Sequence, residues 1–439
     1  MSSQIVEESQ DFSYLTDKIR VHPTQQAVSK LWVVSYACKD VWNYFNEQRY
    51  NPQFKANYYN QKRQLSSLKQ QQPELKVPSS QVLQEVVKSL NSGWQTFFTK
   101  RKNGDTEARP PKFKSYKYFY TQKYPQPGNS FEITDNTLRL AYGKGKKDWI
   151  EIELPEREYD FDNVKTVTIS FDKRDKKWYV SLSRIVPIPD YTSNPHTIYF
   201  DPGCKMTLTG IKTDGTVVEY DINPLRQLNF KHYQLIDKLK SLRDKKQKHS
   251  KRWRRYNKKI SALHSKIRTQ TNHYLHKLAN KILRDHPNTD FKVGNWDKKQ
   301  TLADTDITFV NKRINRQVQN NNPVKKLVGY LNYKSAFEGQ QVEEFDERGT
   351  TRTCSSCDNR QKMPPSKRVY DCPECGFKLE RDINSVMNFL KKHHYALWQG
   401  LTGSTTISIV RYSFDPLSGA NRPAKHRSIV LNYQDAWGL

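Results

Sequence analysis

The sequence lacks any apolar run long enough to cross a membrane, and its first ten residues are polar and acidic. A spanning helix needs about 20 consecutive apolar residues, and a secretory signal needs an apolar segment close to the N-terminus. Both features are therefore excluded. We expect an intracellular protein that does not act at a membrane.

Acidic residues are also scarce relative to basic ones. The chain holds 74 lysines and arginines against 45 aspartates and glutamates, so its net charge is +29. An excess of this size attracts polyanions and speeds their encounter with the protein. Nucleic acid is the expected partner, and a solubilising basic surface is the alternative.

Cysteine is sparse and unevenly placed. Cys38 and Cys204 stand alone and suit a core, whereas the other four cysteines form two C-x2-C pairs within 22 residues. In an intracellular protein this spacing favours one tetrahedral zinc ion over disulfides, and an iron-sulfur or redox role is the alternative. Four thiolates leave no position open for a substrate, so we expect a structural zinc ribbon. Its ligands are Cys354, Cys357, Cys372 and Cys375.

Two segments differ in how their strands and helices are arranged. The first combines short strands with helices, and its opening strand could close with later strands, which would make the helices an insertion into a β domain. The second alternates strands with helices, which indicates an α/β domain. The elements expected in the first are strands at 11–24, 131–154 and 164–184, helices at 25–49 and 82–101, and a variable connection at 51–78. Those expected in the second are strands at 196–204, 215–222 and 289–296, a helical stretch at 233–285, a mobile loop at 297–323, and a tail at 402–439 with no assigned order.

Basic residues concentrate in residues 238–259, where twelve lysines and arginines accompany a single acid, Asp244. A solvated helix usually mixes both signs of charge, so this stretch is expected to face nucleic acid. Its run KRWRRYNKK could also serve in nuclear import. The segment 109–124 interleaves basic and aromatic residues, which suits phosphate contact and base stacking, although it could be a simple loop. The candidate nucleic-acid contacts are Lys245, Lys246, Lys251, Arg252, Arg254, Arg255, Lys112 and Lys114.

Two acids stand at the ends of predicted elements. Asp201 ends the strand in TIYFDPGC, and Asp382 opens an amphipathic helix in FKLERDINSVMNFLK. Each alone is an ordinary turn former or helix cap. Their order in the chain is more informative: strand-end acid, basic helices, zinc ribbon, then the acid at a helix start.

The combination TIYFDPGC, TTRTCSSC, CPECGFKLERDINSVMNFL and the early KIRVHPTQQ resembles the TnpB and Fanzor proteins, which are RNA-guided DNA nucleases of transposable elements. The resemblance extends more loosely over residues 11–392. It implies a RuvC-like nuclease of RNase H fold with three catalytic acids, of which the first corresponds to Asp201 and the last to Asp382.

The second acid departs from the commonest family pattern. Gly294 and Asn295 in TDFKVGNWD stand where many relatives have a glutamate. Some relatives, Fanzor proteins among them, look as if this glutamate has moved to just before the ribbon, where FDERGTTRTC supplies Glu347. We therefore select Glu347 and keep Glu343, Glu344 and Asp297 in reserve. The alternative is that Glu347 is a solvated loop acid.

The resemblance also implies how the three acids work. Phosphodiester hydrolysis needs an attacking water and a stabilised leaving oxygen, which two magnesium ions about 3.5 to 4 Å apart can supply. Carboxylates suit magnesium because it prefers oxygen ligands. Asp201 would bridge both ions, and Glu347 and Asp382 would each complete one side. No side chain would act as the nucleophile.

By resemblance, the expected fold is multidomain α/β plus β, with a wedge β-barrel that carries a helical recognition domain ahead of a RuvC-like nuclease with an inserted zinc ribbon. The expected partners are a structured guide RNA and a target DNA beside a short adjacent motif, bound by one protein copy. The expected parts are 1–30, N-terminal tail and first wedge strand; 31–125, recognition domain; 126–192, remaining wedge; 193–349, nuclease; 350–380, zinc ribbon; 381–400, final nuclease helix; 401–439, C-terminal tail.

Two other functions fit the same residues. The glycine at 294 would suit a nuclease-dead, RNA-guided regulator that only occupies DNA. The acids would also suit an RuvC-like resolvase or transposase that uses no RNA. The expected location is the nucleus for a eukaryotic or eukaryotic-virus source and the cytoplasm otherwise.

Overall fold

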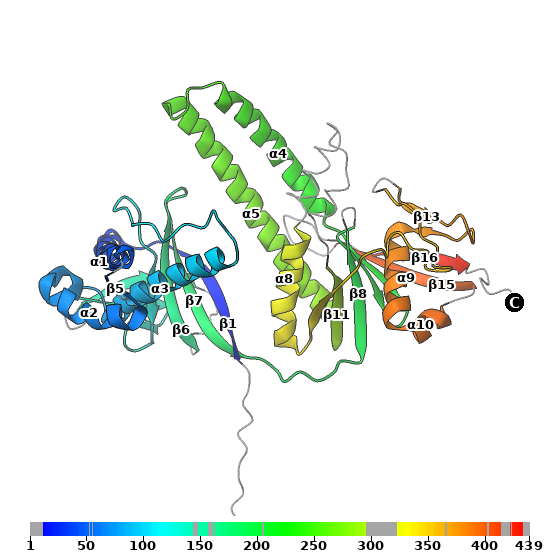
Figure 1. Ribbon diagram of the computed structural model, residues 1–439, viewed down its shortest axis with the longest axis horizontal. Helices are drawn as coiled ribbons and strands as arrows, with labels where there is room; N and C mark the ends of the chain where they lie inside the picture. The colour runs from blue at the N-terminus through cyan, green and yellow to red at the C-terminus, as the bar shows by residue number, and fades with distance from the viewer. Residues whose placement is uncertain are drawn as a thin grey trace, which may run out of the picture. The chain divides into compact units, whose positions relative to one another are not determined.

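The computed structural model describes residues 12–51, 53–54, 56–143, 148–156, 161, 163–203, 206–295, 323–364, 367–401, 404–413, 422 and 424–432. The chain divides into two compact units. One is Phe12–Pro187, and the other consists of Ile188–Leu439 together with Met1–Asp11. We call them the N-terminal and the C-terminal unit. In Figure 1 the colours run from blue to green over the first and from green to red over the second.

In the N-terminal unit the first strand pairs with the last. β1 (Phe12–Val21) runs antiparallel to β7 (Lys177–Pro187). The helices between them are therefore inserted into a β domain, as the sequence suggested. The strands form two sheets, β1-β7-β6-β2 and β3-β4-β5, and their ladders are not joined among the described residues. Within this described part, strand pairing does not join the two sheets into the predicted barrel. The remaining strands are β2 (Gln122–Pro125), β3 (Phe131–Thr134), β4 (Thr137–Tyr142), β5 (Asp148–Glu153) and β6 (Val164–Asp172).

The inserted helices include one that the sequence analysis missed. α1 (Gln25–Tyr50) and α3 (Ser80–Lys102) match the two predicted helices. The connection between them contains α2 (Tyr58–Gln71) and the 3-10 turn η1 (Pro73–Lys76). α2 offers few apolar residues, so its periodicity is weak. Two leucines, Leu65 and Leu68, enter the core, and buried Gln61 adds a hydrogen bond from Nε2 to the Phe45 carbonyl at 2.8 Å.

The C-terminal unit is built on a seven-stranded mixed sheet with the order β12-β11-β8-β9-β10-β15-β16. β11 is parallel to both β8 and β12, and β9 is antiparallel to β8 and β10. The carboxyl ends of β8, β11 and β12 therefore meet at one edge of the sheet. The first five strands are β8 (His196–Pro202), β9 (Leu208–Lys212), β10 (Val217–Tyr220), β11 (Thr289–Gly294) and β12 (Val342–Phe345).

Helices cover both faces of this sheet. Ile198 and Phe200 of β8 pack into one core with α5 (Lys251–Asp285) and α8 (Val324–Ser335). Tyr199 points the other way, into a core with α9 (Arg381–His393). Figure 1 shows α8 and α9 on opposite sides of β8 and β11. Side chains alternate along a strand, so Asp201, two residues beyond Tyr199, is directed toward α9.

The predicted helical stretch 233–285 is two helices. α4 (Asn223–Asp244) and α5 form an antiparallel pair (Figure 1), held together by the small core of Ile236, Leu239, Ile260 and Ile267. The break lies at the basic turn, where Ser250 caps α5 by accepting a hydrogen bond from the Trp253 N–H. The predicted loop that follows β11 lies almost entirely outside the described residues.

The segment 401–439, which the sequence assigned to a tail, contributes two strands. β15 (Ser404–Tyr412) pairs in parallel with β10 and antiparallel with β16 (Lys425–Asn432). The reason lies in buried contacts that a single sequence does not display: Ile407, Ile409 and Leu431 enter the core beneath α9. Glu219 of β10, 2% exposed, binds Arg411 and Arg427 from these strands.

Four short elements complete the unit: the 3-10 turn η3 (Ala336–Glu338), the hairpin strands β13 (Val369–Asp371) and β14 (Lys378–Glu380), and α10 (Tyr395–Gly400). None of the helices in the described part of the chain is both long and apolar enough to span a bilayer.

Candidate metal centre and acidic site

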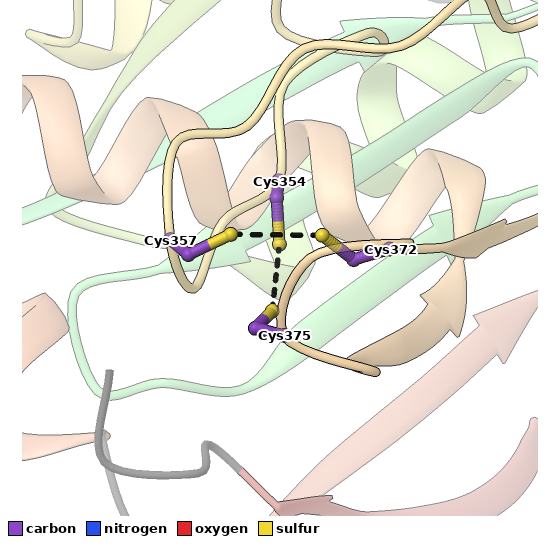
Figure 2. Close-up of side chains that lie close together, drawn as sticks. All are labelled: Cys354, Cys357, Cys372 and Cys375. Atoms are coloured by element: carbon purple, nitrogen blue, oxygen red, sulfur yellow. Dashed lines mark hydrogen bonds between the residues drawn. The ribbon is translucent and has the colours of Figure 1, made fainter.

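The four paired cysteines converge as their spacing predicted. Their sulfurs all lie within 4.8 Å of one another, and Figure 2 shows them directed toward a common centre. Cys354 Sγ lies 3.8 Å from Cys375 Sγ, and Cys357 Sγ lies 3.5 Å from Cys372 Sγ. A tetrahedral zinc site with bonds of about 2.3 Å requires sulfurs about 3.8 Å apart, so the geometry fits one zinc ion.

The pKa values of the thiols differ, and metal binding would complete their deprotonation. Burial raises the pKa of Cys354 and raises that of Cys357 to about 11. At Cys372 burial also acts to raise the pKa, but backbone N–H groups of Cys375 and Glu374 overcome it and bring the value to about 7. Zinc would displace the remaining thiol protons, so its binding contributes to the folding of the ribbon.

The ribbon is fastened to α9 by two asparagines that the sequence analysis did not select. Asn384 accepts from the Ser355 N–H at 3.0 Å and donates to the Thr353 carbonyl at 2.8 Å. Asn388 donates to the carbonyls of Thr350 and Thr353, both at 2.8 Å. The sequence did offer a signal for these two residues: two asparagines four residues apart in a mostly apolar helix, where a buried amide needs hydrogen-bond partners.

The first candidate acid, Asp201, is 8% exposed at the carboxyl end of β8. Its neighbour Phe200 pairs with Val293, which places Gly294 beside Asp201 on the adjacent strand. Gly294 in turn pairs with Phe345 of β12. Asp201, Gly294 and the chain entering Glu347 therefore meet at the same sheet edge.

Glu347 occupies the space that the glycine leaves. A Cβ added to Gly294 would lie 3.0 Å from Glu347 Cβ and 3.1 Å from Glu347 Cδ, and would collide with the carboxylate. A side chain at position 294 and the observed position of Glu347 are thus mutually exclusive. Glu347 Oε2 is buried and has no hydrogen-bond partner among the described residues, which is costly unless a cation binds there.

The third candidate acid, Asp382, lies in the first turn of α9 with its side chain 19% exposed. It forms an ion pair with Arg368, which lies just before β13 in the ribbon. Arg368 was not selected from the sequence, where it is one of many basic residues. Through this pair the ribbon contacts the acidic site directly.

The three carboxylates repel one another electrostatically. Burial, followed by the charges of Glu347 and Asp382, raises the pKa of Asp201 well above its ordinary value, and a hydrogen bond from Ser385 acts to lower it. Burial and nearby Asp346 raise the pKa of Glu347 to about 7. Converging, mutually repelling oxygen ligands form a donor set that suits divalent cations such as magnesium.

The two reserve acids that the structure describes lie away from Asp201. Glu343 and Glu344 are exposed on β12, and Glu343 is bound to Lys292 at 3.2 Å. Asp297 lies outside the described residues. Of the three described candidates for the second acid, Glu347 is the one that the structure brings to Asp201.

Six of the candidate nucleic-acid contacts lie at the turn between α4 and α5 and are exposed: Lys245, Lys246, Lys251, Arg252, Arg254 and Arg255. Lys112 is also exposed. Lys114 differs, because its ammonium lies 4.1 Å from the centre of the Trp42 ring and burial lowers its pKa. Lys114 is therefore already engaged within the protein.

Two family models match this chain. The model described as "Cas12f1-like, TNB domain" matches residues 325–389, which contain Glu347, the four cysteines and Asp382. The model described as "Probable transposase" matches residues 196–299, which begin at β8 and contain Asp201. The three candidate acids and the ribbon thus all lie within the matched regions.

Individual relatives agree with these models. "TnpB-like protein L79" of Acanthamoeba polyphaga mimivirus is 25% identical over 232 residues, which cover 52% of this chain but only 43% of that protein. InsQ of Escherichia coli (strain K12), whose name proposes an RNA-guided DNA endonuclease, is 26% identical over 334 residues, covering 74% of this chain and 77% of InsQ.

Among solved structures, Cas12f1 from a cryo-EM complex with sgRNA and target DNA superposes with a TM-score of 0.56. The match covers 86% of this chain and 98% of Cas12f1 at 13% identity, so it shows a shared fold. The α/β fold with a RuvC-like domain and a zinc-ribbon domain is thereby confirmed. The order of acids and cysteines, the two family models and the relatives agree: the chain belongs to the TnpB-like family of transposon-associated proteins.

Proposed function

We propose that the chain is an RNA-guided, magnesium-dependent DNA endonuclease. The observation that carries this proposal is the convergence of Asp201, Glu347 and Asp382, which come from three distant segments, at one sheet edge beside the ribbon. A buried carboxylate that is repelled by two neighbouring acids is costly in a structural site and useful in one that binds divalent cations.

Each acid has a distinct place in the proposed site. Asp201, the most buried, holds the centre, and Glu347 and Asp382 complete its two sides. When bound, two magnesium ions supply an activated water and stabilise the leaving oxygen of the phosphodiester. Arg368 is close enough to Asp382 to limit how far that carboxylate moves.

The proposal includes a relocated glutamate. Glu347 reaches the sheet edge from the loop after β12 and fills the space over Gly294. The glycine is then a requirement of the relocated arrangement. A nuclease-dead regulator becomes less favoured, because Glu347 lies in the space that a side chain at position 294 of β11 would occupy.

The remaining parts follow from the proposed function. Residues 12–187 would supply the wedge and recognition parts, with boundaries as expected from the sequence. The exposed basic turn between α4 and α5 suits the backbone of a guide RNA or of the guide–target duplex. The RNA and DNA in the Cas12f1 complex support this choice of partners.

The test uses protein purified with the RNA that co-purifies from its natural locus. That RNA is sequenced, and DNA complementary to it is offered as a substrate with magnesium. We expect cleavage by the wild type and none by Asp201→Ala, which should retain the RNA. Cleavage that persists in Asp201→Ala contradicts the proposed site.

The same assay separates the other candidate functions. DNA binding without cleavage by the wild type supports a regulator. Strong cleavage by RNA-free protein supports a resolvase or transposase.

A further inference from the structure

Two buried hydroxyl groups lie between the three acids. Ser385 is fully buried on α9, three residues after Asp382, and Thr350 is 9% exposed where the chain enters the ribbon, three residues after Glu347. Their oxygens are 3.0 Å apart. Neither residue is among the proposed metal ligands.

These hydroxyls connect two of the acids. The Ser385 hydroxyl donates a hydrogen bond to the Asp201 carboxylate. On the other side, the backbone N–H and the hydroxyl of Thr350 both donate to the backbone carbonyl of Glu347, at 3.3 Å and 2.8 Å. Ser385 also shares α9 with Asp382, so the pair is linked to all three acids.

The protons of these contacts can be assigned, because each hydroxyl has one proton. Thr350 donates its proton to the Glu347 carbonyl, so its oxygen is left to accept from Ser385. The Ser385 proton is then shared between Thr350 Oγ and the Asp201 carboxylate. The two hydroxyls therefore connect the Glu347 loop to Asp201.

Attachment of the ribbon does not depend on these hydroxyls. The amides of Asn384 and Asn388 bind the backbone at Thr350, Thr353 and Ser355 independently. Loss of the Ser385 hydroxyl should therefore leave the ribbon docked on α9. What it removes is a hydrogen-bonded link between the Asp201 carboxylate and the backbone of the loop that carries Glu347.

We propose that Thr350 and Ser385 are positioning residues that set the spacing of Asp201 and Glu347 for divalent-cation binding. This inference rests on the nuclease site proposed above. Partners that orient metal ligands typically account for about 10- to 100-fold in metal affinity or activity.

The test measures Mn²⁺ binding to the zinc-loaded full-length chain by electron paramagnetic resonance of the free ion. Asp201→Ala defines the background from all other sites. We expect Ser385→Ala and Thr350→Val to weaken the affinity at the acidic site about tenfold, and Thr350→Ser, which keeps the hydroxyl, to bind as the wild type does. Ser335→Ala, which removes a buried serine hydroxyl from α8, is the matched control and should have no effect.

The outcomes separate this inference from the proposed function. If Asp201→Ala loses a binding site while Ser385→Ala and Thr350→Val keep wild-type affinity, the positioning role is wrong and the metal site remains. If Asp201→Ala itself binds Mn²⁺ as the wild type does, the proposed metal site is wrong. Should Ser385→Ala fail to fold, the comparison of Thr350→Val with Thr350→Ser still tests the positioning role. Valine has nearly the volume of threonine but lacks the hydroxyl, whereas serine keeps the hydroxyl.

Discussion

The zinc ribbon and the acidic site are neighbours that are built in opposite ways. The ribbon takes four ligands from 22 consecutive residues, and a single ion can bind all four sulfurs. The proposed acidic site would take three ligands, from residues 201, 347 and 382, and the charges of Glu347 and Asp382 raise the pKa of Asp201. A local, closed site is specified by spacing, whereas a distributed site depends on the surrounding fold to bring its members together.

The largest effect should come from the distributed site. Glu347→Gln keeps the shape of the side chain but removes the charge, so DNA cleavage should fall by more than about 100-fold because a proposed ligand is lost. Glu344→Gln, on the exposed face of β12, is the matched control. Single-turnover cleavage with saturating RNA and magnesium measures the difference, and equal rates for both variants would exclude Glu347.

The next effect concerns the local site. Cys354→Ser should lose zinc, because a structural site with three thiolates binds far more weakly, and cleavage should fall as Arg368 and the Thr350 turn lose their order. Zinc content by atomic absorption and limited proteolysis within 350–380 measure this change. Cys38→Ala, which alters a buried thiol in the N-terminal unit, should retain both zinc and activity. Full zinc occupancy in Cys354→Ser would contradict the assigned role.

The acidic site should also make stability depend on pH when magnesium is absent. The pKa of Glu347 is raised from 4.5 to about 7, so the folded state retains its proton more strongly than the unfolded chain does. This contribution is complete below pH 4.5 and is lost as pH rises through 7, and it amounts to at most about 3 kcal/mol.

Urea unfolding of zinc-loaded protein at several pH values measures this dependence. Glu347→Gln cannot ionise, so the fall in unfolding free energy between pH 5 and 7.5 should be smaller in this variant. Magnesium should reduce the fall in the wild type. An unchanged pH dependence in Glu347→Gln would show that the carboxyl is not buried as described.

The smallest effect is expected at the basic turn between α4 and α5. Replacing Lys245 and Lys246 with alanine should weaken RNA or duplex binding uniformly across sequences and reduce the salt dependence by up to about two counterions. Replacement of the same residues with arginine keeps the charge and should have little effect. Binding curves at several salt concentrations measure both effects. Equal affinity and equal salt dependence in the alanine variant and the wild type would show that the turn does not contribute.

The contrast between the two sites also explains what the sequence could predict. The cysteine spacing, the strand ending at Asp201 and the helix starting at Asp382 are local patterns, and the structure contains each of them. The separation of the first unit into two sheets and the strands β15 and β16 depend on pairing between distant segments, so periodicity did not reveal them. α2 was missed because only two leucines and Tyr58 of its fourteen residues pack into the core, and one of its three buried residues is a glutamine.

The second acid shows the same limit more sharply. When β11 is considered alone, the glycine at 294 suggests that the second catalytic acid has been lost. Only the parallel pairing of β8, β11 and β12 shows that the space above this glycine is filled by Glu347. Arg368, Ser385 and Thr350 carry no sequence signal at all, because their importance comes from what they contact.

The most direct test of the acidic site exchanges the two positions. Glu347→Gly should abolish cleavage of guide-matched DNA, and adding Gly294→Glu in the same chain should restore a measurable part of it, since the carboxylate then enters the same space from β11. Gly294→Glu alone should impair cleavage, because Glu347 already fills that space. Restoration by the double variant is the predicted result. Undiminished cleavage by Glu347→Gly would contradict the account.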